Sequence, residues 1–285
     1  MSTGLVIFLA VLQGATELFP VSSLGHAVVV PALFNLGVDT SAPTFVPFLA
    51  FLHIGTGVAL VALYWDQWWR IVRGFFTAAV RGRIDNSEQR LAMLLVVGTM
   101  PAGVIGFLLE TPLKSLFAHP RLAAAFLVVN GAVLATAEML RRRDERRRGA
   151  GRPAEREERF GTIEQMSFAR AGLVGFFQVF ALLPGISRSG VTMAGSLVAG
   201  LRHGEAVRFA FLLATPIILA AGILEVPQLP SSGAPFGLYT VGAVLAGLIA
   251  YASARFLIKY FEIGRLDPFA AYCAILGVTG LILLH

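Results

Sequence analysis

The sequence predicts an all-α integral membrane protein with six transmembrane helices and two re-entrant helix pairs, arranged as an inverted-topology repeat. Three observations predict it: an apolar composition, two polar motifs that each interrupt an apolar region, and an uneven distribution of basic residues. The mean hydropathy is +0.74, and 14% of residues are charged where a soluble domain has about 25%. So little charge cannot cover a soluble surface, and lipid must be the solvent for much of the chain.

Six runs are long and apolar enough to cross a bilayer, which takes about 20 helical residues. The predicted spans are 45–65, 91–109, 121–140, 207–225, 237–257 and 267–284. Pro101 and Pro216 fall inside spans and are expected to kink them.

Two further apolar regions, 4–36 and 168–200, are each interrupted by a polar motif containing Gly and Pro. The arm 171–183 would reach only about 20 Å, short of a hydrocarbon core of about 30 Å. Non-helical backbone survives at membrane depth only where protein or a water-filled cavity satisfies it. We therefore expect both regions to form re-entrant helix pairs, each with its polar motif at the tip.

The positions of the basic residues favour this topology. With both regions re-entrant, one side of the membrane holds nearly all of the 23 Lys and Arg residues, and Lys114 and Arg121 lie on the other. The loops on the basic side are 66–90, 141–170, 201–208 and 255–265. A full crossing of 168–200 would divide the charges more evenly, against the positive-inside rule. The basic side is therefore expected to be cytoplasmic.

The chain is thus expected to divide into a first repeat at 1–140, an Arg-rich cytoplasmic connector at 141–167, and a second repeat at 168–285. Each repeat holds one re-entrant pair and three spans. Three is odd, so the halves must have opposite orientations. Inverted repeats place their functional site where the broken helices meet.

Several function classes and segments are excluded. The net charge of +6 does not predict nucleic-acid binding, because the Arg residues lie in short gaps between apolar runs and no binding motif is visible. The single cysteine, Cys273, lies in an apolar run and is expected to be a buried hydrophobe. The first basic residue is Arg70, which argues against a cleaved signal peptide.

The two predicted tips share a pattern: a Gln, later a Pro, and a Ser three residues after the Pro. Together they offer one carboxylate, four hydroxyls, one imidazole and one guanidinium. These groups belong to Glu17, Ser22, Ser23, Ser187, Ser189, His26 and Arg188. A guanidinium matches phosphate oxygens, glycines let backbone N–H groups approach a ligand, and helix N-termini attract anions. The set suits a phosphate group carried by a lipid-embedded molecule.

Each residue also has a structural alternative. For Ser22 and Ser23 the alternative is a helix cap, which is the lesser interpretation for both. His26 fits a satisfied structural histidine, and Glu17 with Arg188 fits a purely structural ion pair between the repeats. His53, a lone imidazole in a span, is more often a packing or hydrogen-bonding residue, and we retain it as a secondary candidate.

Two motifs resemble those of a known family. TELFPVSSLGH at 16–26 resembles its glutamate-rich first motif, and PGISRSG at 184–190 resembles its second. Residues 53–56 and 209–216 also fit the pattern. The family is the undecaprenyl-diphosphatase, or bacitracin-resistance, family of bacterial inner-membrane proteins. The resemblance covers essentially the whole chain.

The resemblance implies hydrolysis of undecaprenyl diphosphate to undecaprenyl phosphate at the outer face of the membrane, assisted by Mg²⁺ or Ca²⁺. That reaction recycles the carrier lipid for cell-wall synthesis. The implied catalytic residues are Glu17, Ser23, His26 and Arg188; the implied phosphate ligands are Ser22, Gly185, Ser187, Arg188, Ser189 and Gly190; the implied metal ligands are Glu17 and Gln13. Gln13 stands where many relatives have a second Glu, and Leu24 where Thr is common, so position 24 is assigned no chemistry.

In the expected mechanism Ser23 attacks the terminal phosphorus, His26 exchanges its proton, and Arg188 clamps the phosphate. Attack by water or by His26 remains open, as do the lipid chain length, the metal and the oligomeric state, a homodimer among the options. The rival function is a transporter or flippase for an anionic polyprenyl lipid, since inverted repeats with re-entrant tips are transporter architecture. The other lipid-phosphatase superfamily is disfavoured because no suitably spaced His-x₃-Asp follows Arg188.

Overall fold

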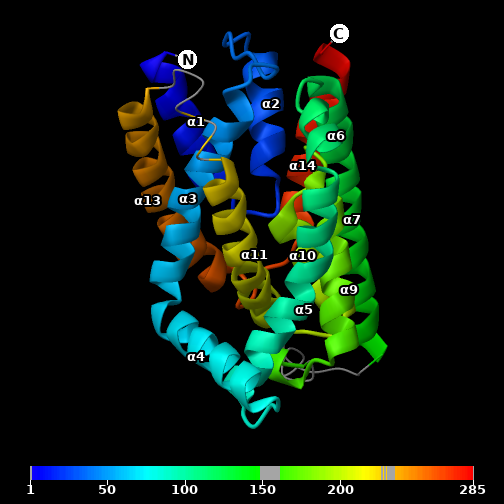
Figure 1. Ribbon diagram of the computed structural model, residues 1–285. Helices are drawn as coiled ribbons and strands as arrows, with labels where there is room; N and C mark the ends of the chain where they lie inside the picture. The colour runs from blue at the N-terminus through cyan, green and yellow to red at the C-terminus, as the bar shows by residue number, and fades with distance from the viewer. Residues whose placement is uncertain (1, 148–160, 226, 228, 230–234, 285) are drawn as a thin grey trace.

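The computed structural model describes residues 2–147, 161–225, 227, 229 and 235–284 (Figure 1). These residues form helices, and the β-pairing recorded among them is one isolated bridge between Gly161 and Leu201. The first part of the chain holds α1 (Thr3–Thr16), α2 (Ser23–Leu33), α3 (Phe45–Leu63), α4 (Trp65–Arg81), α5 (Ser87–Leu108), α6 (Glu110–Leu116) and α7 (Pro120–Arg147). The second holds η1 (Ile163–Gln165), α9 (Phe168–Val179), η2 (Phe180–Leu182), α10 (Arg188–Val198), α11 (His203–Glu225), α13 (Phe236–Tyr260) and α14 (Asp267–Leu283). The predicted all-α membrane class is confirmed.

Five of the six predicted spans coincide with helices long and apolar enough to cross a bilayer, namely α3, α5, α7, α11 and α13. The sixth, expected at 267–284, is α14 with 17 residues. A straight helix of that length reaches about 25 Å, somewhat less than the hydrocarbon core. Six full spans therefore stay a prediction.

Both predicted broken regions form hairpins of short helices. The arms α1 and α2 have 14 and 11 residues, and α9 and α10 have 12 and 11. Figure 1 shows α1 and α2 in the upper half of the bundle. The second hairpin has its two ends together, because Gly161 N donates to Gly200 O at 3.0 Å. The tips touch: a Cβ added to Gly25 would lie 2.9 Å from Gly185 Cα.

One stretch differs from the prediction. Residues 66–90 were expected to be a loop, but most of them form α4, which crosses the lower end of the bundle at an angle to α3 (Figure 1). Its exposed apolar residues recur at helical spacing and are Trp65, Trp69, Val72, Phe75, Phe76 and Val80. Arg70 and Arg73 lie beside these apolar residues, with the Arg73 guanidinium over the Trp69 ring, and this amphipathic character is typical of helices that lie in a membrane interface. The end of the span predicted at 121–140 also differs, since α7 continues to Arg147; most of the rest of the predicted connector, 148–160, lies outside the described residues.

The first arm of each hairpin packs closely on a long helix of the other half of the chain. A Cβ on Gly14 of α1 would lie 2.5 Å from Ala246 O of α13, and one on Gly175 of α9 would lie 2.4 Å from Gly98 O of α5. No larger side chain fits at either glycine, so the backbones pack directly on each other. Phe19 of the first tip packs against both apolar clusters of the bundle. The tips therefore lie at the junction of the core, held by both halves.

A buried carboxylate ties together three helix ends at the lower end of the bundle. Glu138 of α7 is fully buried; its Oε1 lies 2.6 Å from Arg265 Nη1, and its Oε2 lies 3.2 Å from both His203 Nε2 and Leu266 N. Arg265 also bonds Glu145 at 3.1 Å. Burial alone would lower the pKa of Arg265, but these two carboxylates outweigh it and raise the pKa above its ordinary value. The arginine therefore stays charged and joins α7 to the α13–α14 connection.

Removing Glu138 should destabilise the fold strongly. Glu138→Leu removes the buried acceptor of Leu266 N, while Arg265 keeps Glu145, and a buried donor left without its partner costs about 1–3 kcal/mol. The control is Arg81→Gln, which removes an exposed pair with Asp85 worth about 0–1 kcal/mol. Unfolding midpoints measured in one detergent should fall clearly for the first variant and barely for the second. Equal midpoints for the two variants would contradict the buried role of Glu138.

Reporter fusions test the predicted sidedness. Fusions after residues 80 and 262 should report the cytoplasm, because the chain near them carries the excess of basic residues. Fusions at residues 116 and 231 should report the outside. A cytoplasmic signal at 231 would show that 168–200 crosses the membrane fully, against the re-entrant placement.

Candidate active site

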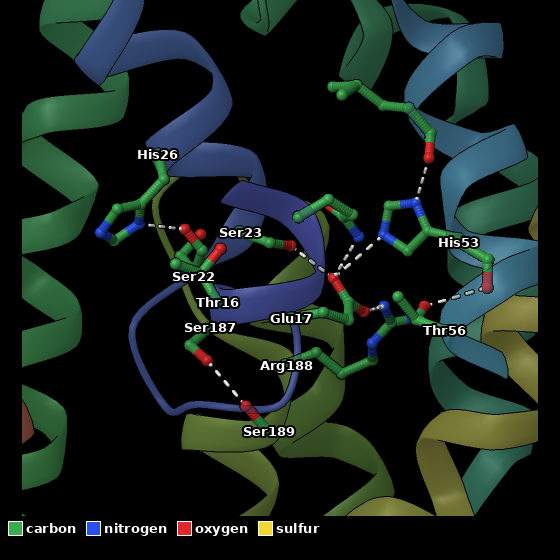
Figure 2. Close-up of polar contacts among 12 residues, drawn as sticks. Thr16, Glu17, Ser22, Ser23, His26, His53, Thr56, Ser187, Arg188 and Ser189 are labelled. Carbon is green, nitrogen blue, oxygen red and sulfur yellow. Dashed lines mark hydrogen bonds and ion pairs between the residues drawn. The ribbon is translucent and has the colours of Figure 1, made fainter. Parts of the chain in front are cut away.

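Glu17 lies at the centre of the polar groups brought together by the two tips (Figure 2). Its side chain is 3% exposed. Oε1 accepts from Arg188 Nη2 at 2.6 Å, and Oε2 accepts from Gln13 Nε2 at 2.8 Å and from the hydroxyl of Ser23. His53 Nε2 lies 3.2 Å from the same Oε2. One carboxylate thus joins α1, α2, α3 and α10.

Local geometry at the first tip turns Ser23 toward that carboxylate. The preceding Ser22 has φ +69°, a backbone conformation that side-chain-bearing residues rarely adopt. Its hydroxyl accepts from Gly25 N at 3.2 Å and so caps α2, which begins at Ser23. The structural alternative is therefore realised for Ser22, whereas Ser23 does not serve as the cap.

The second tip repeats the cap and then bonds to the first. Ser187 accepts from Gly190 N at 3.1 Å and caps α10, whose first residue is Arg188. The hydroxyls of Ser187 and Ser189 lie 3.3 and 2.9 Å from Phe19 O of the first tip. Both hydroxyls were predicted to bind phosphate, and in this structure both bond the opposite tip.

The two glycines predicted to contact phosphate also pack against protein. Gly185 has φ +105°, and a Cβ there would lie 2.3 Å from Ala123 O. A Cβ on Gly190 would lie 3.2 Å from Pro20 O. Close packing of the tips on each other and on α7 is a sufficient reason for glycine at both positions, and their role toward phosphate stays a prediction.

Asn130 of α7 is a positioning residue that sequence reasoning missed. It is fully buried, its Nδ2 donates to Pro20 O at 3.0 Å, and its Oδ1 accepts from Ser187 N at 3.0 Å. One side chain thus bonds both tips. A lone amide inside the apolar run 121–140 was the available signal, because a polar group in a span needs a partner there.

His26 does not face Ser23, contrary to the expected proton exchange between them. Its Nδ1 lies 2.7 Å from Ser22 O and its Nε2 lies 2.8 Å from the hydroxyl of Tyr272. Figure 2 shows the imidazole on the other side of the tip from Glu17. The hydroxyl of Ser23 instead donates to Glu17, and the imidazole beside that carboxylate belongs to His53, the secondary candidate.

The polar groups open onto a cavity of about 230 Å³. Its polar lining includes Glu17, Ser22, Ser23, His53, Ser187 and Arg188, and its apolar walls include Leu49, Ala102, Phe117, Leu182 and Ile217. His26 and Ser189 are not among the lining residues. A charged floor beneath walls from α3, α5, α6, η2 and α11 suits a molecule with an anionic head and an apolar chain.

A divalent cation would find few ligands from the protein. Among the described residues, no group of three or more His, Cys, Asp or Glu side chains gathers to hold a metal. Gln13 Oε1 is buried without a hydrogen-bond partner in the described structure. Together with the Glu17 carboxylate it offers the hard oxygen donors that Mg²⁺ and Ca²⁺ prefer. The donor chemistry of the two residues fits a cation, and of the two only Glu17 lines the cavity.

Comparisons with known proteins agree with the motifs. The family model of the bacitracin resistance protein BacA matches residues 6–279. A protein of Acidiphilium cryptum named undecaprenyl-diphosphatase is 46% identical over 100% of this chain and 99% of its own. Proteins named undecaprenyl-diphosphatase 2 from Frankia alni and Burkholderia thailandensis are 40% and 44% identical over 94% and 98% of this chain, and over 94% and 95% of their own. Because the family model and the relatives both match nearly the whole chain, the chain belongs to the bacitracin resistance protein BacA family.

Proposed function

We propose that the protein hydrolyses undecaprenyl diphosphate to undecaprenyl phosphate and inorganic phosphate, recycling the carrier lipid for cell-wall synthesis. The observation that carries the proposal is the contact of the Ser23 hydroxyl with Glu17, beside Arg188, at the polar floor of an apolar-walled cavity. Phosphoryl transfer requires a nucleophile, an adjacent base and a positive charge that binds the phosphate, and here these are the Ser23 hydroxyl, the Glu17 carboxylate and the Arg188 guanidinium. The names of the full-length relatives support the substrate.

Ser23 is the nucleophile of this mechanism and Glu17 its base. Ser23 Oγ attacks the terminal phosphorus, its proton passes to Glu17 Oε2, and the bond to undecaprenyl phosphate breaks. Water then attacks the phosphoserine; inorganic phosphate leaves, and the serine oxygen recovers the proton from Glu17. The predicted proton exchange through His26 gives way to Glu17, because the hydroxyl already donates to that carboxylate.

His53 takes part in the same chemistry through the partners of its two ring nitrogens. Its Nδ1 lies 2.6 Å from Leu49 O, which can only accept, so Nδ1 carries a proton. Its Nε2 faces Glu17 Oε2 at 3.2 Å. A neutral Nε2 and a carboxylate are both acceptors, so this contact requires a shared proton between them. His53 therefore stabilises the charge on Glu17 and adjusts how readily it accepts a proton from Ser23.

Arg188 binds the transferred phosphate. Its guanidinium has five N–H donors, and the contact with Glu17 uses Nη2 alone. The remaining donors match phosphate oxygens and stabilise the charge that develops on them. Arg188 and Ser23 each begin a helix of 11 residues, and the free N–H groups of such first turns favour an anion.

A divalent cation, held by Glu17 and Gln13, would neutralise part of the diphosphate charge when bound. The protein's own contribution is to place those two oxygen donors one helical turn apart on the same face of α1, next to Ser23 and Arg188.

The protein is a multi-pass membrane protein, and we place it in the bacterial inner membrane with the site toward the outer face. The inverted repeat is supported by the two hairpins, each of which packs its first arm on α13 or α5 of the other half. The placement in the membrane is supported by the arginines in the sequences of α4 and of the C-terminal end of α7, two segments that lie at the end of the bundle opposite the chain termini (Figure 1). A transporter or flippase would use the same architecture but has no need of a hydroxyl paired with a carboxylate, and the relatives do not favour it.

Phosphate release by the purified protein tests the function. In detergent, the C55 lipid diphosphate should yield inorganic phosphate, because detergent abolishes transport and leaves hydrolysis intact. Chelator should slow the reaction, and added Mg²⁺ or Ca²⁺ should restore it. Binding of the lipid without release of phosphate would favour the transporter. Release that chelator leaves unchanged would remove the metal role of Gln13 and Glu17.

Ser23→Ala should abolish turnover and leave binding of the lipid diphosphate intact, because Arg188 and the cavity remain. Loss of a single transition-state donor costs about 10²–10³ in rate, and loss of a nucleophile costs more. The matched control is Ser22→Ala, which removes a cap and should destabilise the protein by about 1 kcal/mol. Single-turnover phosphate release and a binding assay on both variants test whether Ser23 is the nucleophile. A Ser23→Ala rate within tenfold of the parent would favour direct attack by water, since His26 does not line the cavity.

Asn130→Leu should lower the turnover number more than it weakens substrate binding. The substitution keeps a similar volume but leaves Pro20 O and Ser187 N without their buried partner, so the tips lose their common anchor. Asn130→Asp, which keeps the acceptor for Ser187 N and loses the donor to Pro20 O, should recover part of the activity. Kinetic constants and unfolding midpoints for both variants separate the two bonds. Equal effects on turnover number and KM would show that Asn130 does not position the site.

A further inference from the structure

His26 and His53 make the same kind of hydrogen bond through Nδ1 but have different partners at Nε2. In both, Nδ1 lies against the carbonyl four residues earlier: Ser22 O at 2.7 Å for His26, and Leu49 O at 2.6 Å for His53. A carbonyl can only accept, so Nδ1 is the protonated nitrogen in each ring. The difference lies at Nε2, which faces the Glu17 carboxylate in His53 and the Tyr272 hydroxyl in His26.

Because of that difference, both ring nitrogens of His26 have hydrogen-bond partners while the ring stays neutral. A tyrosine hydroxyl can donate, so Tyr272 donates to the bare Nε2 while Nδ1–H donates to Ser22 O, and both ring nitrogens are satisfied without added charge. The rings of His26 and Tyr272 are nearly parallel, with 5° between their planes and centroids 5.5 Å apart. His26 is 1% exposed and is absent from the cavity lining, so neither nitrogen faces the substrate.

The atom that His26 holds belongs to the strained residue of the site. Ser22 O accepts from the His26 side chain at 2.7 Å and from His26 N at 3.1 Å, which occupies both of its lone pairs. Ser22 has φ +69°, and such strain persists only where the surroundings over-determine it. The next residue is Ser23, whose direction toward Glu17 follows from the conformation at Ser22.

We propose that Tyr272 and His26 are positioning residues: Tyr272 fixes the tautomer of His26, and His26 holds the Ser22 carbonyl so that the strained turn presents Ser23 to Glu17. This role rests on the proposed function, since it needs Ser23 to react. It assigns a part to Tyr272, which lies on α14 at the far end of the sequence from Ser23. It also separates the two imidazoles, with His53 acting on the charge of Glu17 and His26 acting on geometry alone.

Substitutions at His26 distinguish positioning from proton transfer. The amide nitrogen of Asn is as many bonds from Cα as Nδ1, and that of Gln is as far as Nε2. His26→Asn can therefore still donate to Ser22 O and should keep its turnover within about fivefold of the parent, the effect of one hydrogen bond of about 1 kcal/mol. His26→Gln and His26→Ala should lose at least about tenfold more than that. If Asn and Gln are equally inactive, by the 10²–10⁴ typical of a lost general acid or base, the positioning role is overturned.

Substitution of Tyr272 tests the coupling. Tyr272→Phe should lower the turnover number by about fivefold with KM unchanged, since it removes one hydrogen bond that the substrate does not touch. In the His26→Asn background, which has no Nε2, it should have no further effect. The control is Tyr251→Phe on the exposed face of α13, which should match the parent. If the losses of turnover from Tyr272→Phe and His26→Asn were additive, the proposed coupling of Tyr272 to Ser22 through His26 would be overturned.

A measurement that needs no activity completes the test. In protein labelled with ¹⁵N-histidine, the signal that His26→Asn removes should be that of a neutral ring protonated at Nδ1, and Tyr272→Phe should perturb it. A charged ring, or one protonated at Nε2 alone, would overturn the proposal whether or not the protein hydrolyses the diphosphate. A neutral Nδ1–H ring in a protein that releases no phosphate would instead show that the proposed function is wrong and the contact correct.

Discussion

The structure depends on one buried charge, the carboxylate of Glu17, at the meeting point of two broken helices. An isolated charge at that depth costs several kcal/mol, so it must collect donors from every element around it. It does so from Gln13, Ser23, His53 and Arg188, which lie on four different helices. The same requirement that makes the carboxylate tolerable therefore brings Ser23, the proposed nucleophile, and Arg188, the proposed phosphate-binding residue, within reach of one another.

The non-helical backbone of the first tip has an equally strict requirement. Carbonyls without helical partners must be satisfied by protein or water at membrane depth. Phe19 O accepts from Ser187 and Ser189, Pro20 O accepts from Asn130, and Ser22 O accepts from His26. Most polar side chains of the two motifs thus hold the turn. Few remain to contact substrate, and Ser23 and Arg188 are the clearest among them.

The sequence predicted the helical class, five of the long helices and both hairpins, because apolar run length and the cost of broken backbone in lipid are local properties. It also predicted Glu17, Ser23 and Arg188 as candidates, since polar groups in apolar runs are conspicuous, and the structure places these three together at one cavity. It could not predict which groups face one another. The bond from His26 to Tyr272 spans most of the chain, and Asn130 contacts both tips from a stretch of α7, 122–135, that is otherwise apolar. Pairing of that kind follows from packing. The helical nature of α4 was readable from its amphipathic spacing, but its charges favoured a loop.

The ion pair of Glu17 with Arg188 links the resting site to the occupied one. A free guanidinium in the cavity would be as costly as a free carboxylate, so in the absence of substrate each neutralises the other. A diphosphate brings negative charge to Arg188, whose unused N–H donors can bind it without releasing Glu17. In the proposed mechanism, the phosphate shares the charge of Arg188 with Glu17, so the carboxylate receives less compensation from that arginine. Under the same proposal His53, whose Nε2 lies 3.2 Å from Glu17 Oε2, remains beside the carboxylate when substrate is bound.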